Sequence, residues 1–299
     1  MSVAAPAPPN STAACRKHPE KVAWWRCDEC GKVHCDECLK VQVPGRIRTE
    51  SCPACKGYLR KAHVPSPDDV PTGFPGMLQD AAAYPLRGHG LVLIFLGGLF
   101  LAFIVLLSRS WKIRIGLFFA VFGAGYLAAY MLHIVEASAN GKRKLPEWPE
   151  FSNFWDSICI PFFQVLLPVA LCVLIPACAP VVLLGWNEQA FAIGVALAIV
   201  CSFYMPMAIL SIAVNNAVAG MHPATVLPAI GAVFPRYAAI WLVLVALGTT
   251  SQLLYFFVLD RIPFVGIPLD MWTTIYLVAV EARLLGSLYH QRRGKLKLV

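Results

Sequence analysis

Cysteine and histidine residues stand in four close pairs near the beginning of this chain, and this pattern restricts its fold more than any other feature. The members of each pair are separated by two residues, and all four pairs lie between positions 15 and 55. A two-residue gap lets one tight turn present two thiolate or imidazole groups to a tetrahedral zinc ion. The pattern therefore predicts two zinc ions, held by Cys15, His18, Cys27, Cys30, Cys35, Cys38, Cys52 and Cys55.

Zinc sites with four protein ligands leave no coordination position for water or substrate, which favours a structural role over hydrolysis. A domain over residues 15–60 also buries too little apolar surface to be stable by itself. Zinc would therefore supply on the order of 10 kcal/mol of its folding free energy. The alternative is a single zinc ion with the remaining thiols free. Spacing alone permits either sequential or interleaved pairing of the four turns.

Three motifs in this segment resemble a B-box-type zinc finger: CRKHP from Cys15, AWWRCDECG from Ala23 and CDEC from Cys35. The resemblance implies a small α+β cross-brace, in which alternate pairs share an ion. It places Cys15, His18, Cys35 and Cys38 on one ion and Cys27, Cys30, Cys52 and Cys55 on the other. The chain departs from the family at its last pair, where many B-boxes carry two histidines after a shorter gap. We expect the inserted segment 39–51 to form a small hairpin.

Three aromatic or imidazole side chains near these ligands lie outside the pairing pattern. His34 directly precedes Cys35, and we expect it beside a site rather than on a metal ion. Trp24 and Trp25 are expected to form the small core around the ions. One of these two rings is expected to face outward, where a tryptophan is a candidate contact for a protein partner.

Most of the chain beyond this segment is apolar. With 58% hydrophobic and only 14% charged residues, the composition lies outside the range of soluble globular proteins and indicates an integral membrane protein. A membrane-spanning helix needs about 20 predominantly apolar residues. Residues 89–299 are therefore predicted to form an all-α polytopic membrane domain of six spans, at 90–108, 115–135, 159–184, 190–214, 238–259 and 268–289.

Two segments outside these domains have other compositions. Residues 1–14 are small, polar and rich in proline, without the basic flank and apolar core of a secretory signal, and we expect them to be disordered. Residues 61–88 contain five prolines and no periodic apolar face, which indicates a linker. The later part of this linker, 74–84, is apolar enough to lie along the membrane surface.

The distribution of Lys and Arg predicts the orientation in the membrane. With both termini in the cytoplasm, the inner loops and tail hold more basic residues than the outer loops, although the basic cluster at 109–114 opposes this orientation. Topology then explains most of the net charge of +8, and no nucleic-acid partner is expected.

Few charged residues lie within the predicted spans. Glu136 ends the second span and Arg283 lies near the inner end of the sixth, so we expect the two to form an ion pair. Glu281 lies deeper and indicates either a proton or cation site or a structural hydrogen bond. The third span is expected to be kinked or broken by Pro161, Pro168, Pro176 and Pro180. We expect segments 149–164 and 223–236 to lie at the membrane surface.

Two further motifs, GKRKLPEW from Gly141 and EARLLGSLY from Glu281, are similar to those of bacterial six-span membrane proteins of unknown function. These proteins distantly resemble the Yip family of trafficking proteins. The resemblance implies an architecture and a place in the bacterial inner membrane, without catalytic residues. The chain also contains no nucleotide-binding glycine loop, nucleophile elbow, HExxH or dinucleotide fingerprint, so no enzymatic activity is expected.

These features together favour a membrane-anchored scaffold or sensor whose cytoplasmic zinc module binds a protein partner. One alternative is a small transporter or channel that the zinc domain gates. Another is a Yip-like protein that shapes membranes.

Overall fold

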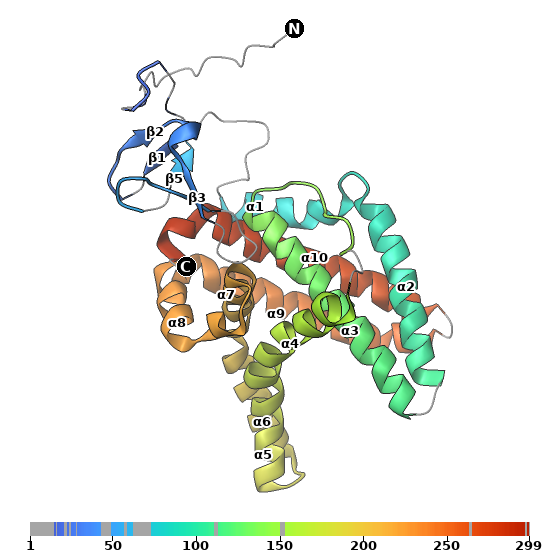
Figure 1. Cartoon of the computed structure of the whole chain (residues 1–299). Helices are drawn as coiled ribbons and strands as arrows, with labels where there is room; N and C mark the ends of the chain where they lie inside the picture. The colour runs from blue at the N-terminus through green and yellow to red at the C-terminus, as the bar shows by residue number, and fades with distance from the viewer. Residues whose placement is uncertain are drawn as a thin grey trace. The chain divides into compact units, whose positions relative to one another are not determined.

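The structure is a computed structural model of the 299-residue chain (Figure 1). It describes residues 15, 17–20, 23, 25–27, 29–42, 49–56, 59–61, 73–110, 113–149, 153–262, 265–296 and 298. The chain divides into two compact units, Met1–Asp69 and Val70–Val299, which we describe in turn. The segment expected to be disordered, 1–14, and residues 62–72 of the expected linker lie outside the described residues.

The amino-terminal unit is built from short strands. They are β1 (Trp25–Cys27), β2 (Val33–His34), β3 (Lys40–Gln42), β4 (Thr49–Ser51) and β5 (Leu59–Lys61), with one 3-10 turn, η1 (Asp36–Cys38), after β2. β1 lies between β2 and β5 in an antiparallel sheet. β3 and β4 pair in antiparallel fashion, with Lys40 opposite Ser51, so the inserted segment contains the expected hairpin.

Buried side chains in this unit cluster around cysteines. One cluster consists of Trp25, Cys27, Cys52 and Leu59, and the other of Cys15, Ala23 and Cys35. Trp25 is only 9% exposed and donates its ring N–H to Asp36, so it belongs to the core, whereas Trp24 lies outside the described residues. Two clusters of this size provide little hydrophobic stabilisation, and the unit therefore needs another source of stability.

The second unit is helical. Its elements are α1 (Phe74–Ala83), η2 (Tyr84–Leu86), α2 (Gly90–Ser110), α3 (Ile113–Ala139), η3 (Trp155–Cys159), α4 (Ile160–Val169), η4 (Ala170–Leu174), α5 (Ile175–Leu184), α6 (Glu188–Ser202), α7 (Met205–Asn215), η5 (Val218–Met221), α8 (Pro223–Ala232), α9 (Phe234–Phe257), η6 (Leu259–Arg261) and α10 (Gly266–Leu296). The elements η2, η5 and η6 are 3-10 turns, whereas η3 and η4 are π turns.

Several helical runs are long and apolar enough to cross a membrane. Four meet this length and hydropathy requirement as single helical runs: Gly90–Ser108, Ile115–Ala139, Trp155–Leu184 and Phe234–Phe257. α6 and α7 qualify only as a pair, with a bend of 41° between them. The described residues thus hold four candidate spans, or five with the bent pair, and six are not confirmed. The expected sixth span, 268–289, lies within α10, which carries Asp270, Glu281 and Arg283 and is not among the candidates.

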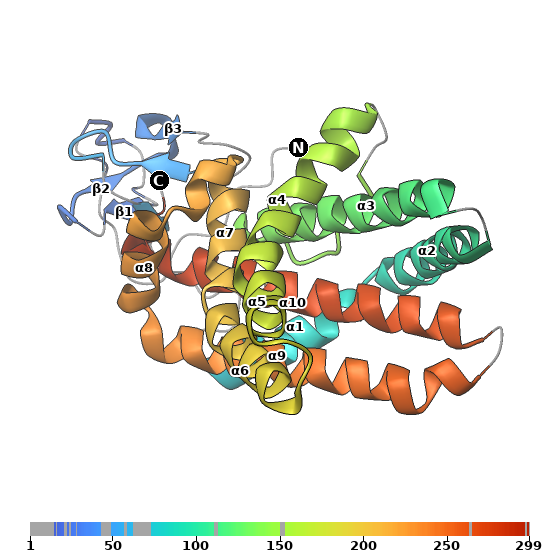
Figure 2. The ribbon, with the colours of Figure 1, turned by 90° about the horizontal axis from the view of Figure 1, so that it is seen from below.

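α10 is the helix on which most of this unit packs. It lies against α1, α2, α3 and α9, and Figure 2 shows α2, α3, α9 and α10 side by side. Two adjacent glycines of α2 make room for indole rings. A Cβ atom at Gly97 would lie 2.1 Å from the ring of Trp148, and one at Gly98 would lie 1.9 Å from the ring of Trp272. Small residues thus allow close packing, as they do in the helix bundles of membrane proteins.

The run Trp155–Leu184 is a helix that is interrupted twice. The π turns η3 and η4 come shortly before Pro161 and Pro176, and Pro168 and Pro180 lie inside α4 and α5. Proline has no amide donor and clashes with the preceding turn, which the wider π turn relieves. The span was expected to be kinked or broken; the chain instead stays helical throughout this run, which is one candidate span, and the prolines are accompanied by the two π turns. Beyond it, α5 and α6 pack together as a hairpin that projects from the unit (Figure 1).

Two expectations about surface segments are wrong in part. The linker is expected to extend to residue 88, but α1 and η2 pack against α10, with Met77, Ala81 and Tyr84 buried. Segment 149–164 is expected to lie at the surface, but its described residues from Trp155 onward begin a candidate span. In segment 223–236, α8 is a short apolar helix whose first turn is capped by the side chain of His222.

Candidate metal centre

The first candidate metal site brings together Cys15, His18, Cys35 and Cys38. The Nδ1 atom of His18 lies 3.2 Å from the Sγ atom of Cys35 and 3.3 Å from that of Cys38. The Sγ atoms of Cys15 and Cys38 are 3.6 Å apart, and the four ligand atoms all lie within 4.8 Å of one another. Tetrahedral zinc with bonds of about 2.3 Å holds its sulfur ligands about 3.8 Å apart. The four atoms therefore have the spacing of a coordination shell.

The second candidate site brings together Cys27, Cys30, Cys52 and Cys55. The Sγ atoms of Cys27 and Cys55 are 3.5 Å apart, and those of Cys30 and Cys52 are 3.7 Å apart. Cys27 and Cys52 are buried, whereas Cys30 and Cys55 are exposed. This site is thus open to solvent on one side.

A hydrogen-bonded backbone turn at each ligand pair directs both side chains of the pair toward the same site. In the first site, the second member of each pair donates its amide to the carbonyl of the first member at 3.1 Å. In the second site, Gly31 and Lys56 donate to the carbonyls of Cys27 and Cys52 at 3.1 and 2.9 Å, and both adopt a left-handed backbone, with φ of 67° and 61°. Glycine takes this conformation freely, but it is strained for lysine. The turn at Lys56 therefore needs support from the rest of the site.

Alternate pairs share a site. The first pair along the chain joins the third, and the second joins the fourth, which is the interleaved arrangement that the B-box resemblance implies. Each site encloses part of the chain that belongs to the other. Closing either site therefore shortens the loop that the other must close, which lowers its entropic cost and couples the two.

The thiols of these clusters do not ionise equally. Burial raises the pKa of Cys27 and Cys38 to about 12, and neighbouring thiols add to the effect. Burial also opposes ionisation of Cys15, but backbone amides outweigh it and lower its pKa to about 6. The amide of Lys32 has the larger effect on Cys30 and lowers its pKa to about 7. A bound divalent cation would favour the thiolate form of every cysteine in a set, although it balances only two of their negative charges.

His34 lies beside the second site rather than in the first. Its Nε2 atom is 3.3 Å from the Sγ atom of Cys52, and the residue is buried. His34 is the last residue of β2, and the next residue, Cys35, is a ligand of the first site. Two consecutive residues thus contact different clusters. The ring is thus placed to donate a hydrogen bond to a ligand thiolate, a contact that orients ligands and tunes metal affinity.

The helical unit contains a buried ionic cluster that sequence reasoning found only in part. Arg283, fully buried in α10, donates from Nε and Nη2 to one Oδ2 atom of Asp80 on α1, at 3.0 and 2.9 Å. Its Nη1 atom donates to the carbonyl of Lys142 at 2.6 Å, and its guanidinium lies 4.6 Å from the ring centre of Tyr84. Asp80 also accepts a hydrogen bond from Arg87 at 2.5 Å. The cluster ties α1, η2 and the segment after α3 to α10.

Asp80 replaces Glu136 as the described ionic partner of Arg283. Burial opposes ionisation of Asp80, but the guanidinium groups of Arg87 and Arg283 outweigh it and hold its pKa below the usual value. Glu136 lies near the end of α3 and Glu281 lies two residues before Arg283 on α10, and both are half-buried. Asp80 lies in the segment that was expected to be a linker. An acidic residue in a linker is expected to be exposed to solvent, so the sequence did not indicate that Asp80 is buried in an ion pair.

No protein-family model, curated protein or solved structure matches this chain. The B-box and Yip resemblances therefore stay expectations from short motifs. The metal centre is inferred from the chemistry and spacing of its eight ligands.

Proposed function

We propose that this chain is a zinc-binding membrane protein with a non-enzymatic role, in which the amino-terminal unit is a zinc-stabilised module that binds a protein partner. One observation carries the proposal: each of the two clusters brings four thiolate or imidazole donors to within 4.8 Å of one another. Zinc is held by four such donors in structural sites. With every position taken by protein, no position stays open for catalysis.

The ligand sets favour zinc over other metals. One cluster has three thiolates and one imidazole, and the other has four thiolates. Soft thiolate ligands in tetrahedral geometry select zinc or iron–sulfur clusters, and a set with one histidine fits zinc better. The small core around Trp25 and Leu59 supports a folding role for the ions, since it cannot stabilise the unit by itself.

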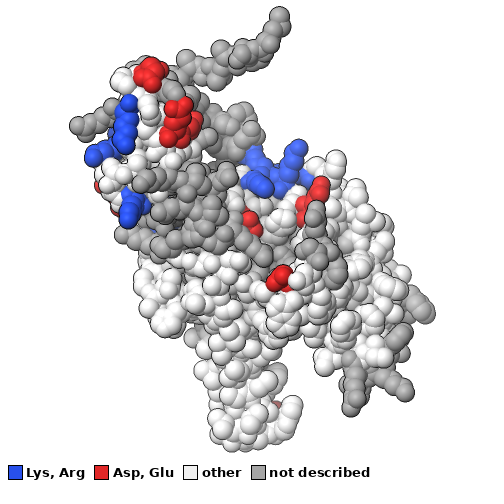
Figure 3. Space-filling view, in the orientation of Figure 1, with Lys and Arg blue, Asp and Glu red and all other residues white. Residues whose placement is uncertain are grey.

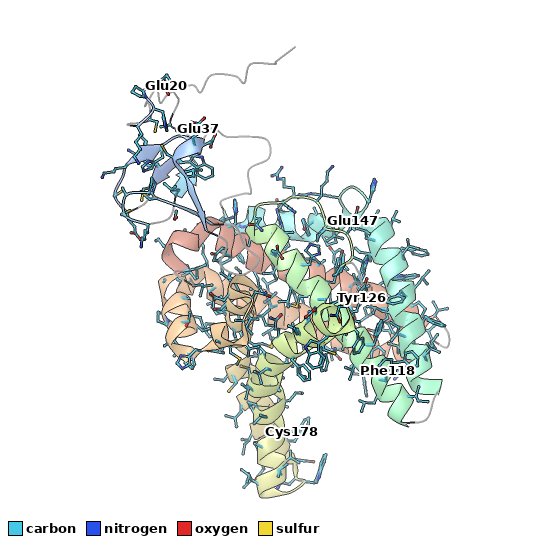
Figure 4. All side chains as sticks on the ribbon, in the orientation of Figure 1. Glu20, Glu37, Phe118, Tyr126, Glu147 and Cys178 are labelled. Atoms are coloured by element: carbon cyan, nitrogen blue, oxygen red, sulfur yellow. The ribbon has the colours of Figure 1, made fainter. Side chains whose placement is uncertain are left out.

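The exposed surface of this unit supports contact with a polar partner. Lys17, Arg26 and Lys32 are exposed alongside Glu20 and Glu29. Figure 3 shows side chains of both charges close together on this unit, and Figure 4 labels Glu20 and Glu37 there. Because Trp25 is buried, we expect the partner to be held through charged side chains rather than through this ring. Such contacts weaken as salt concentration rises.

We further propose that the helical unit anchors the module in the bacterial inner membrane, with both termini in the cytoplasm. The long apolar helical runs support the anchor. None of the eleven cysteines is paired in a disulfide, and the reducing cytoplasm is the compartment that keeps metal-binding thiolates available.

The proposal is tested with the full-length protein in detergent. Metal content is measured by mass spectrometry, and cellular proteins that co-purify are identified at low and high salt. We expect two zinc ions per chain and a partner that is lost in the Cys27→Ser/Cys52→Ser variant. Cys178→Ser, which changes an exposed cysteine of α5 outside the clusters (Figure 4), is the matched control and should keep both. Equal capture by the zinc-site variant would contradict the proposal.

The interrupted helices favour a second candidate function, a small transporter or channel that the zinc unit gates. Two π turns and the 41° bend between α6 and α7 interrupt the regular α-helical hydrogen bonding of candidate spans, as the discontinuous helices of transport sites do. Ion flux into proteoliposomes separates the candidates, since a scaffold carries none. In a transporter that uses Glu281 for protons or cations, Glu281→Gln should abolish the flux.

A further inference from the structure

The segment 141–149, which follows α3, is held from inside by hydrogen bonds to its backbone. The hydroxyl of Tyr84 donates to the carbonyl of Lys144 at 3.0 Å. The Nη1 atom of Arg283 donates to the carbonyl of Lys142 at 2.6 Å. Because these donors belong to η2 and α10, the surrounding helices fix the backbone at both lysines.

Apolar side chains of the same segment are inserted into the unit. Leu145 is buried, and the ring of Trp148 stacks on Tyr130 with the ring centres 4.0 Å apart. Trp148 fills the space left by Gly97 and donates its ring N–H to the carbonyl of Leu93 at 3.2 Å. The segment is therefore anchored along its length and does not behave as a free loop.

The lysine side chains of the segment face outward. Lys142 and Lys144 are exposed, although their carbonyls are bound from within, and Arg143 between them is half-buried. Figure 3 shows Lys and Arg side chains gathered over this end of the helical unit, whereas the α5–α6 hairpin has none in its sequence. The segment thus presents two lysines on a fixed backbone.

Acidic residues near these lysines do not cancel their charge. Asp80 is buried and already bound by the guanidinium groups of Arg87 and Arg283. Glu147 is exposed on the same segment (Figure 4), and Glu136 is half-buried near the end of α3. Five basic groups surround these three carboxylates: Lys142, Arg143, Lys144, Arg87 and Arg283. The net charge of this surface is therefore positive.

The surface lies where two candidate spans meet the membrane boundary. The span Ile115–Ala139 ends shortly before Lys142, and the span Gly90–Ser108 begins shortly after Arg87. The start of the span Gly90–Ser108 lies beside the segment itself, since a Cβ atom at Gly90 would lie 3.6 Å from the side chain of Leu145. Lipid phosphates lie at the level where the hydrocarbon core ends. With these two runs spanning a membrane, the two lysines would lie at the level of the headgroups.

We propose that Lys142 and Lys144 form a binding site for the phosphate of an anionic phospholipid in the surrounding leaflet. An exposed ion pair gains up to about 5-fold in affinity, so two ammonium groups on one phosphate gain up to about 25-fold. The fixed backbone adds to this preference, because little chain entropy is lost when the lipid binds.

The test uses the full-length protein in a neutral detergent, titrated with fluorescent phosphatidylglycerol and, separately, with fluorescent phosphatidylcholine. We expect the anionic lipid to bind up to about 25-fold more tightly than the zwitterionic one. The Lys142→Gln/Lys144→Gln variant should lose most of this preference, whereas Lys142→Arg/Lys144→Arg should keep it. Lys17→Gln/Lys32→Gln removes two exposed lysines of the other unit and should also keep it.

Three results would overturn the proposal. One is an unchanged lipid preference in Lys142→Gln/Lys144→Gln, and another is an equal loss in the Lys17→Gln/Lys32→Gln control, which would indicate a general charge effect. The third is binding of soluble glycerol phosphate as tightly as phosphatidylglycerol, which would indicate a free phosphate ligand. Tyr84→Phe removes only the donor to the Lys144 carbonyl and should lower the preference severalfold; an unchanged preference would contradict the role of the fixed backbone.

Discussion

Arg283 of α10 donates two hydrogen bonds to the same carboxylate oxygen of Asp80 on α1, although the two residues are 203 positions apart. Both side chains are buried, and Asp80 has Arg87 as its second partner. Removing one member of a buried ion pair typically costs about 3–5 kcal/mol, because the other charge is left without compensation. The two members of this pair are therefore expected to respond differently to substitution.

Asp80→Ala should lower the free energy of unfolding by about 3–5 kcal/mol, because it leaves the guanidinium of Arg283 buried and uncompensated. Arg283→Met should cost less, since Arg87 stays beside Asp80. The double variant Asp80→Ala/Arg283→Met should be more stable than Asp80→Ala alone. Denaturation in detergent, followed by circular dichroism, measures these differences. Additive losses in the double variant would contradict the pairing.

The contribution of Asp80 to stability should depend on pH. Its two guanidinium partners hold its pKa in the folded protein below the ordinary value of 3.8. A group whose pKa is lowered on folding stabilises the protein above its unfolded-state pKa, and this contribution disappears as pH falls through the folded-state pKa. The stability difference between the wild type and Asp80→Asn should therefore be constant above about pH 5 and shrink in stronger acid. A difference that grows toward low pH would be inconsistent with this ionic contact.

Each metal site should be separable by substitution. Cys15→Ser should remove the ion of the first site and Cys52→Ser that of the second, so either variant should hold one zinc ion where the wild type holds two. Because loop closure couples the two sites, the remaining ion should be held more weakly than in the wild type. A chelator should remove both ions and abolish hydrogen-exchange protection in β1 and β5, because metal binding supplies on the order of 10 kcal/mol of folding free energy. Protection in α10 should be unchanged. Persistence of protection in β1 after complete metal removal would refute the folding role.

His34→Ala should weaken the second metal site by about 10- to 100-fold without removing a ligand, because a hydrogen bond to the Cys52 thiolate is lost. A chelator titration followed by zinc release should show the second site losing its ion earlier. Release from the first site should stay at the wild-type concentration. If both sites weaken equally, His34 acts through the fold of the unit and not through Cys52.

Gly98→Ala should destabilise the helical unit by about 1–3 kcal/mol, because the new methyl group overlaps the ring of Trp272. The matched control is Gly248→Ala on α9, where a Cβ atom meets no neighbour within 4 Å. That substitution should be neutral or stabilising by up to about 1 kcal/mol through helix propensity. Thermal unfolding in detergent compares the two. Equal midpoints would show that α2 and α10 separate enough to admit the methyl group.

The metal ligands could be predicted because their chemistry is local. Two residues between the members of each pair are enough to specify a turn, and the turn specifies a shared ion. Which turns share an ion depends on how β1 and β2 place them, and spacing left that open. The interleaved arrangement was available only from the B-box resemblance.

The ionic cluster could not be predicted in the same way. Asp80 follows a proline-rich stretch and its partner is 203 positions away, so no local pattern connects them. The one available signal was that Asp80 is the only charged residue between Asp69 and Arg87 and that Arg283 lies in an apolar run, so each requires a partner of opposite charge when buried. Arg283 also lowers the mean hydropathy of α10, although Asp80 on α1 neutralises its charge in the structure. A hydropathy average over α10 counts the charge of Arg283 but does not include Asp80, which lies on another helix and compensates that charge.

The two π turns of the Trp155–Leu184 run change which side chains lie on one face of this helix. A π turn contains one residue more than an α-helical turn, which corresponds to a rotation of about 100° in an α-helix. After both turns, the side chains of α5 are displaced by about 200° from the positions that an uninterrupted helix starting at Trp155 would give them. A helical wheel used to choose lipid-facing positions on α5 must therefore begin at Ile175.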